Sequence, residues 1–350
     1  MGWRAFAVVG SMSLVPSIAV MLGPGGSSVL AVNTETGGQA PAAGRGTQKP
    51  EVNDTRTTKD QFDRWMTELS NWSRWGKTDE LGAVNLITAT KRQQAAALVK
   101  AGTVASLAHD LLTEKAVDAQ NPYVLTPRIS EASQYAFDRE TIDFHGYTFS
   151  HMDALCHVGH NGKLYNGFVF QEVATSDRGC LKLGITGVKD QVVTRGVLID
   201  IPRLKGLPYL EPGTHVYRED IEAWEKKAGV RISSGDAILL RTGRWARRAR
   251  VAPFMNAAGF DASVAPLLKE RDVALIGSDG VQDVGTLPGI ALPIHKFAIV
   301  ALGANLFDNL DLEAVADAAA KLNRWEFLFM AAPTPVKNGS GSPINPLAVF

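Results

Sequence analysis

Hydrophobic positions along this 350-residue chain recur with helical and strand spacings in alternation. The helical period predicts helices over Asp60–Asn71, Ala89–Ala101, Arg218–Ala228, Ala262–Glu270 and Leu312–Leu322. Short aliphatic and β-branched runs predict strands over Thr103–Leu107, Val192–Ile201, Ala237–Leu240, Val273–Gly277, Ala298–Phe307 and Glu326–Met330. Such alternation indicates an α/β domain with a substantial core.

The first 58 residues lack this pattern. Arg4 precedes an apolar run, and Val29-Leu30-Ala31 has the small-residue spacing of a signal-peptidase site. These features predict a signal peptide over residues 1–31 and a periplasmic or secreted protein, with an uncleaved membrane anchor as the alternative. Residues 32–58 are rich in Gly, Thr, Ala and Pro, which predicts a disordered spacer before a folded domain over 59–350. After processing, no stable membrane association is expected.

Charge and cysteine content say little about binding partners or cross-links. The chain has 36 basic and 36 acidic residues, so nothing favours capture of nucleic acid or an anionic membrane. Cys156 and Cys180 could form a disulfide after export, but two cysteines alone are a weak basis for this pairing.

Candidate chemistry gathers in one short window of polar residues. Five of its side chains could bind metal or carry protons: His145, His151, Asp153, His157 and His160. On a strand His151 and Asp153 share a face, with Cα atoms roughly 6–7 Å apart, so both can reach one ion. His157 has the same parity, but six extended residues span roughly 20 Å. It therefore joins the site, as a proton carrier or further ligand, only if the chain bends at Leu155-Cys156. The alternative is a polar strand with incidental histidines.

The segment His151-Met-Asp153-Ala-Leu-Cys-His157 resembles the second half of a known signature, His-x-Gly-Thr-His-x-Asp-x-Pro-x-His. That signature marks the metal-dependent cyclase family, which includes bacterial kynurenine formamidases and isatin hydrolases. Tyr147 occupies the position of the first His, and His145 would need a bulged backbone to replace it. The upstream pattern Trp-Gly-x-x-Asp-x-Leu-Gly-x-x-Asn, beginning at Trp75, also resembles the family, although capping and packing explain its residues better than catalysis does.

The resemblance implies a swivelling β/β/α fold and further site residues. His295 follows Leu-Pro-Ile, and Asp308 stands at the end of the next segment, where the family usually has Glu. Together with His151 and Asp153, they are the expected metal ligands. Without the resemblance, a lone His after Pro would more often be structural. Three other residues are expected on the substrate side of the site: Tyr147, Asp279 and Asp283.

The implied activity is metal-dependent hydrolysis of an amide or lactam C–N bond in a small molecule. His157 is the expected proton carrier, and the His/carboxylate donors suit Zn or Mn. The resemblance also implies a homo-oligomer. Two alternatives remain open at this point: a non-catalytic exported binding module on the same fold, and a ring-forming cyclase.

Overall fold

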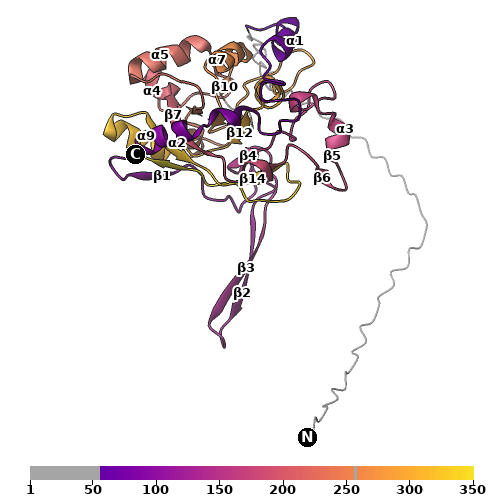
Figure 1. Ribbon diagram of the computed structural model, residues 1–350. Helices are drawn as coiled ribbons and strands as arrows, with labels where there is room; N and C mark the ends of the chain where they lie inside the picture. The colour runs from indigo at the N-terminus through magenta and orange to yellow at the C-terminus, as the bar shows by residue number, and fades with distance from the viewer. Residues whose placement is uncertain (1–55, 256–257) are drawn as a thin grey trace, which may run out of the picture. The chain divides into compact units, whose positions relative to one another are not determined.

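The computed structural model describes residues 56–255 and 258–350 (Figure 1). The predicted signal peptide lies outside these residues, as does all but the end of the predicted spacer. At that end Thr58 caps the first helix by accepting from Gln61 N at 3.2 Å, and the Arg56 guanidinium lies 3.8 Å from the centre of the Tyr217 ring. Across the described ranges, no helix is long and apolar enough to cross a membrane.

The helices and strands alternate along the described chain. The α-helices are α1 (Lys59–Glu68), α2 (Ala89–Ala96), α3 (Phe170–Val173), α4 (Ile201–Lys205), α5 (Arg218–Ala228), α6 (Arg244–Arg248), α7 (Ala265–Glu270), α8 (Pro293–His295) and α9 (Glu313–Leu322). Four 3₁₀ turns and one π-helix accompany them: η1 (Gly82–Leu86), η2 (Tyr165–Gly167), η3 (Ile185–Val188), η4 (Ala262–Val264) and the π-helix η5 (Lys296–Leu302). The strands are β1 (Val104–Ser106), β2 (Val124–Ser130), β3 (Tyr135–Thr141), β4 (His151–Asp153), β5 (Ala174–Thr175), β6 (Gly179–Cys180), β7 (Val193–Asp200), β8 (His215–Val216), β9 (Ala237–Arg241), β10 (Gly259–Phe260), β11 (Leu275–Ser278), β12 (Asn305–Asp308), β13 (Glu326–Met330), β14 (Gly341–Pro343) and β15 (Leu347–Val349).

One large mixed sheet organises the described residues. Its strand order is β1-β15-β13-β7-β9-β11-β12-β4-β14. Strands β7, β9, β11 and β12 run parallel, while the flanking strands pair antiparallel. The central strands are buried, as expected when a parallel sheet is covered on both faces. The predicted α/β character is therefore confirmed.

Helices pack on this sheet through buried side chains. The indole of Trp224 on α5 is buried, and its Nε1 donates to the Leu198 carbonyl of β7 at 2.7 Å. Helix α5 ends at Gly229, whose left-handed φ of 67° suits glycine. Helix α2 also packs against β7, and it is shorter than the predicted Ala89–Ala101.

The predicted strand over Ala298–Phe307 is wrong for most of its length. Residues 296–302 form η5, and only Asn305–Asp308 is a strand. All side chains from Phe297 to Leu302 are buried. A uniformly apolar run shows neither the helical nor the strand period, so its pattern could not distinguish the two.

The upstream motif that begins at Trp75 serves packing and capping. The Asp79 carboxylate accepts from Gly82 N, Asn85 Nδ2 and the Tyr165 hydroxyl, each at 2.9 Å. Gly82 has φ 61°, and a side chain there would run into the Gly303 carbonyl. These contacts join the start of the domain to the chain just before β12, which carries part of the site.

Candidate metal centre

Strands β4 and β12 bring the central side chains together. They pair antiparallel with His151 opposite Asp308. His151 Nε2 lies 3.5 Å from Asp153 Oδ1 and 3.9 Å from Asp308 Oδ2. The predicted strand that places His151 and Asp153 on one face is therefore confirmed.

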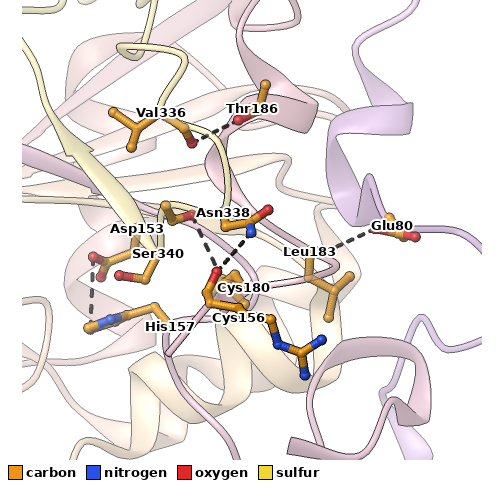
Figure 2. The surroundings of a disulfide bond; sticks show 12 residues. Glu80, Asp153, Cys156, His157, Cys180, Leu183, Thr186, Val336, Asn338 and Ser340 are labelled. Carbon is orange, nitrogen blue, oxygen red and sulfur yellow. Dashed lines mark hydrogen bonds and ion pairs between the residues drawn. A yellow bond between two sulfur atoms is a disulfide. The ribbon is translucent and has the colours of Figure 1, made fainter. Parts of the chain in front are cut away.

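The chain bends after β4, as the inclusion of His157 required. His157 N donates to the Ala154 carbonyl at 3.0 Å, and His157 Nε2 lies 3.9 Å from Asp153 Oδ1. Cys156, within the bend, forms a disulfide with Cys180, and the two Cα atoms are 6.1 Å apart (Figure 2). His157 is more open than His151, with 27% of its side chain exposed against 2% for His151.

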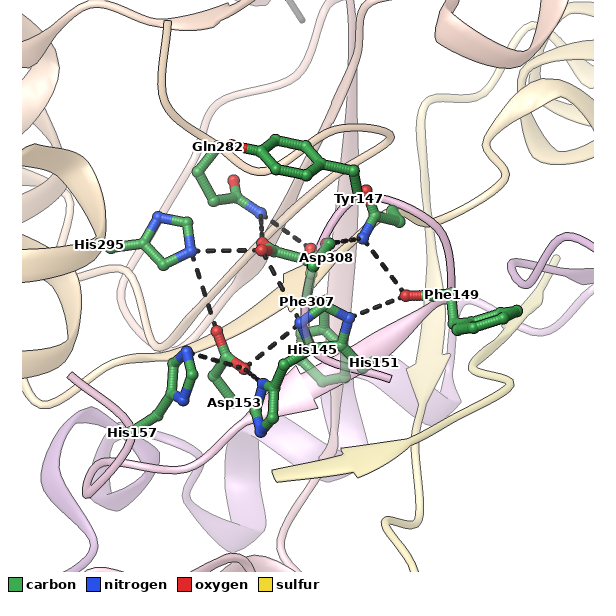
Figure 3. A network of polar contacts seen from close by, with 12 residues as sticks. His145, Tyr147, Phe149, His151, Asp153, His157, Gln282, His295, Phe307 and Asp308 are labelled. Atoms are coloured by element: carbon green, nitrogen blue, oxygen red, sulfur yellow. Dashed lines mark hydrogen bonds and ion pairs between the residues drawn. The ribbon is translucent and has the colours of Figure 1, made fainter. Parts of the chain in front are cut away.

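His145 enters the site, contrary to the expectation from its distance along the sequence. Its Nδ1 lies 3.2 Å from Asp153 Oδ1, and its ring stacks on His157 with centroids 4.1 Å apart (Figure 3). Residues 142–150 form a loop rather than an extension of β4, and Gly146 within it has φ 130°. A glycine directly after a histidine was the available sequence signal that the chain could turn there.

Tyr147 occupies the position of the family's first metal ligand, but its backbone carbonyl binds Arg244. Its carbonyl accepts from Arg244 Nη2, and its half-buried ring lies at the edge of the network drawn in Figure 3. The imidazole that this loop brings to Asp153 is that of His145. A substrate-side role for the Tyr147 ring stays a prediction.

His295 approaches from the short helix α8. Its Nε2 lies 3.2 Å from Asp308 Oδ2 and 3.9 Å from Asp153 Oδ2. Its Nδ1 donates to Asp283 Oδ2 at 2.5 Å, and Asp283 also accepts from Ile294 N. The sequence predicts a substrate-side role for Asp283, whereas the structure shows its carboxylate bound to His295 and to the start of α8. Asp283 therefore positions an imidazole.

Backbone and carboxylate acceptors orient the buried imidazoles. His151 Nδ1 donates to the Phe149 carbonyl at 2.8 Å, as His295 Nδ1 does to Asp283. Each ring then directs Nε2 towards the acidic residues. Metal-binding histidines are commonly held in this way, by a hydrogen bond from the other ring nitrogen.

Asp279 does not join the cluster. Its buried carboxylate accepts from Thr242 N at 2.9 Å, from Thr242 Oγ1 at 2.7 Å and from Gly243 N at 2.7 Å. Burial raises its pKa against these hydrogen bonds. The sequence predicts a substrate-side residue here, but a carboxylate after a buried strand can equally bind a neighbouring backbone turn, and Asp279 binds the turn that follows β9.

Gln282 is a site residue that the sequence reasoning missed. Its Nε2 donates to the Phe307 carbonyl at 2.8 Å and to Asp308 Oδ1 at 3.1 Å. Gln282 has a backbone φ of 61°, which is uncommon for residues other than Gly, Asn or Asp. Its place beside the candidate acid Asp283 is the available signal, but an uncharged amide does not mark a metal or proton-transfer site in a sequence.

The electrostatics centre on Asp153, which is fully buried. Burial raises the pKa of its carboxyl, but His151, His145 and His157 outweigh that effect and hold it well below the usual range. Burial lowers the pKa of His157 despite the attraction of Asp153. For His295, burial is outweighed by Asp308 and Asp283, which hold the pKa well above its ordinary value.

The donor set fits a divalent cation. Two overlapping groups have donor atoms within 4.8 Å of one another, His145-His151-Asp153 and Asp153-His295-Asp308. Two ligands that each lie about 2.0–2.2 Å from a shared zinc are roughly 3–4 Å apart. Several contacts here, from 3.2 to 3.9 Å, have that spacing. Among the described residues, neither carboxylate oxygen of Asp153 has a hydrogen-bond partner. A buried carboxylate left in this state is costly unless a cation binds it.

Comparison with known proteins places this geometry in a family. The cyclase family model matches residues 105–282, more than half of the chain. The chain belongs to the cyclase family. Residues of the matched region that meet at the site include His145, His151, Asp153, His157 and Gln282.

Solved structures agree with the cyclase-family fold. A structure described as a novel cyclase is 29% identical, with a TM-score of 0.75 over 81% of this chain and 99% of that chain. Isatin hydrolase A from Labrenzia aggregata, bound to benzyl benzoate, is 20% identical, with a TM-score of 0.52 over 73% of this chain and 94% of its own. An isatin hydrolase bound to the product analogue thioisatinate is 17% identical, with a TM-score of 0.50 over 75% and 99%. The two isatin hydrolases show the shared fold alone, and the expected swivelling β/β/α architecture is confirmed. The search of curated proteins found no match.

Proposed function

We propose that this cyclase-family chain is a metal-dependent hydrolase that cleaves an amide or lactam C–N bond in a small molecule. The observation that carries the proposal is the buried Asp153 carboxylate, which faces four imidazoles and has no hydrogen-bond partner within the described chain. The substrate class comes from the family resemblance, because isatin hydrolases share the fold.

The proposed ligands are His151, Asp153, His295 and Asp308, and His145 is added from the geometry. When bound, a divalent cation supplies Lewis acidity, which polarises a carbonyl and lowers the pKa of water. Imidazole and carboxylate donors suit zinc, and manganese is compatible with them. Asp283 and the Phe149 carbonyl keep the His295 and His151 rings in orientation.

His157 is the proposed proton carrier. It lies at the partly open side of the cluster, whereas His151 and His295 are buried. Its imidazole accepts a proton from water as the new C–O bond forms, and it returns that proton to the leaving nitrogen as the C–N bond breaks. His145 stacks on this ring and restricts its orientation.

The two alternative functions are a non-catalytic binding module and a ring-forming cyclase. Tyr147 at the position of the first family ligand favours a non-catalytic binding module, but His145 of the same loop brings an imidazole to Asp153. A ring-forming cyclase would use the same ligands and release a cyclised product.

Two substitutions separate metal binding from proton transfer. Asp153→Asn keeps the side-chain size but removes the charge, so we expect it to empty the site. His157→Ala is expected to retain most of the metal and to lose roughly 10²–10⁴-fold in rate. His160→Ala is the matched control, because this histidine of the same window contacts Asp63 instead of Asp153.

The readout is metal content by inductively coupled plasma spectrometry, together with turnover of N-formyl aryl amides and lactams. A metal-free His157→Ala protein beside a metal-replete Asp153→Asn protein would reverse the assigned roles. It would make His157 a primary ligand.

A further inference from the structure

His145 lies on a loop, so its approach to Asp153 depends on the contacts that hold this loop. Residues 142–150 form neither helix nor strand, and Gly146, directly after the histidine, has a backbone φ of 130°. Glycine is the residue that takes such a conformation readily. His145 Nδ1 lies 3.2 Å from Asp153 Oδ1 (Figure 3). A flexible backbone alone would not keep this contact, so side chains from elsewhere in the chain must fix the loop.

Asn309 binds two carbonyls of this loop. It follows the proposed ligand Asp308 directly, and it is fully buried. Its Nδ2 donates to the Gly146 carbonyl at 2.6 Å and to the Phe149 carbonyl at 3.3 Å. The Phe149 carbonyl is also the acceptor that orients His151. One buried amide is therefore bound to the loop at two places.

Arg244 of helix α6 holds the same amide and the same loop. Its Nη1 donates to Asn309 Oδ1 at 2.6 Å, and its Nη2 donates to the Tyr147 carbonyl. The first bond occupies the acceptor end of the Asn309 amide, so the donor end faces the loop. Asp118 Oδ2 lies 3.4 Å from Arg244 Nη2 and supplies the counter-charge for this largely buried cation. Arg244 and Asn309 are here called the clamp.

Asp279 holds the clamp from behind. Its carboxylate accepts from the backbone of Thr242, Gly243 and Arg244, which form the turn into α6. A continuous chain of hydrogen bonds thus runs from the end of β11 through Arg244 and Asn309 to the loop. The planar guanidinium suits the middle of this chain, because its fixed donors can bind an amide oxygen and a carbonyl at the same time.

We propose that Arg244 and Asn309 are positioning residues, which hold the loop so that the His145 imidazole stays beside Asp153. The inference rests on the proposed function, in which His145 is a metal ligand. Neither clamp residue is a metal ligand, and both act through the loop. The clamp also accounts for Tyr147 at the position of the family's first metal ligand, because it binds the Tyr147 backbone while the histidine two residues earlier reaches the site.

Asn309→Gly is the test variant. It removes the amide and keeps the backbone conformation, because Asn309 has a φ of 55°, which glycine adopts readily. The Thr148 and Ser150 hydroxyls still donate to the carbonyls of Asp118 and residue 309, so the loop stays attached. Asn323→Gly is the matched control, because it makes the same change at a φ of 47°, at the exposed end of α9.

Calorimetric titration of chelator-treated chains with Zn²⁺ measures the effect. We expect zinc affinity to fall roughly 10–100-fold in Asn309→Gly and to stay native in the control. His145→Ala should show a comparable loss. Adding Asn309→Gly to His145→Ala should change the affinity by less than about twofold, because the clamp acts through that imidazole. Native affinity in Asn309→Gly, or a larger further loss in the double variant, would overturn the proposal.

Limited proteolysis of the metal-free chains separates this inference from the proposed function. Chymotrypsin has three aromatic sites within the loop, at Phe144, Tyr147 and Phe149. Cleavage at these sites should be faster in Asn309→Gly than in the native chain or the control, with cleavage elsewhere unchanged. A native chain that binds no zinc would contradict the proposed function. The proteolysis would then still decide the clamp, and equal cleavage in Asn309→Gly and the native chain would overturn it.

A second variant covers the case in which circular dichroism shows Asn309→Gly to be misfolded. Arg244→Lys keeps the positive charge beside Asp118 but loses the two fixed donors to the amide and the carbonyl. It should show the same weaker zinc affinity and the same faster cleavage of the loop. Native zinc affinity together with native cleavage in Arg244→Lys would overturn the proposal equally.

Discussion

Removal of the Cys156–Cys180 disulfide is expected to lower the free energy of unfolding and to slow the reaction. The two cysteines are 24 residues apart in the sequence. The chain-entropy relation for a closed loop of that length gives about 3.5 kcal/mol of stability at 25 °C. Both side chains are buried, so the cross-link also joins the bend before His157 to the core.

The metal ligands should respond less than His157. His151 and Asp153 are held in β4 by pairing with β12 and β14, whereas His157 follows Cys156 directly in the bend (Figure 2). The expected result is a lower rate with nearly unchanged metal content. Urea unfolding, turnover and metal analysis of Cys156→Ala/Cys180→Ala measure all three quantities.

Chemical reduction of the native chain is the matched control, since it breaks the cross-link but keeps both sulfur atoms. It should reproduce the loss of stability, and the double variant should not respond to reductant. A difference in unfolding free energy below about 1 kcal/mol would refute the loop-entropy reasoning. An unchanged rate would separate the disulfide from the position of His157.

Three further predictions follow from particular contacts. Asp283→Asn weakens the hold on His295 and should lower metal affinity roughly 10–100-fold by calorimetric titration; an unchanged affinity would contradict its positioning role. Burial raises the pKa of Asp118, but Arg248 holds it below the usual value. The ionised Asp118 carboxylate therefore contributes to stability above about pH 4, and this contribution is lost as the pH falls through its lower folded pKa. The difference in unfolding free energy between the native chain and Asp118→Asn should shrink below about pH 4. A difference that stays constant with pH would contradict the assignment. We also propose export, which the disulfide supports; N-terminal sequencing from the native host should place the mature start near Val32, and an unprocessed cytosolic chain would contradict it.

The parts of the fold predicted from sequence are those with a distinct period. Helix α5 matches its predicted bounds, because Ile221 and Trp224 mark a buried face beside charged positions. The run Ala298–Leu302 has no such contrast, so its predicted strand is wrong. The β2–β3 ribbon was missed for a related reason. Both of its faces are exposed, so its sequence lacks the alternation by which a half-buried strand is recognised.

The candidate site was predictable where its residues lie close in the sequence and on a regular strand. The spacing of His151 and Asp153 was sufficient to place both on one face, and chain length showed only that His157 needs a bend to join them. The position of His145 depends on a loop, which no period describes. Whether Asp279 or Asp283 faces a ligand or a backbone depends on tertiary neighbours, so their sequence positions could not decide it.

The most direct test of the proposed function is turnover measured against metal content. N-formyl aryl amides and lactams would be assayed with the native chain, with the chelator-treated chain, and after zinc or manganese is added back. We predict ring opening or deformylation that disappears with the metal and returns with it. Hydrolysis that persists in fully metal-free protein, or no turnover of either class by metal-replete protein, would contradict metal-dependent cleavage of these C–N bonds.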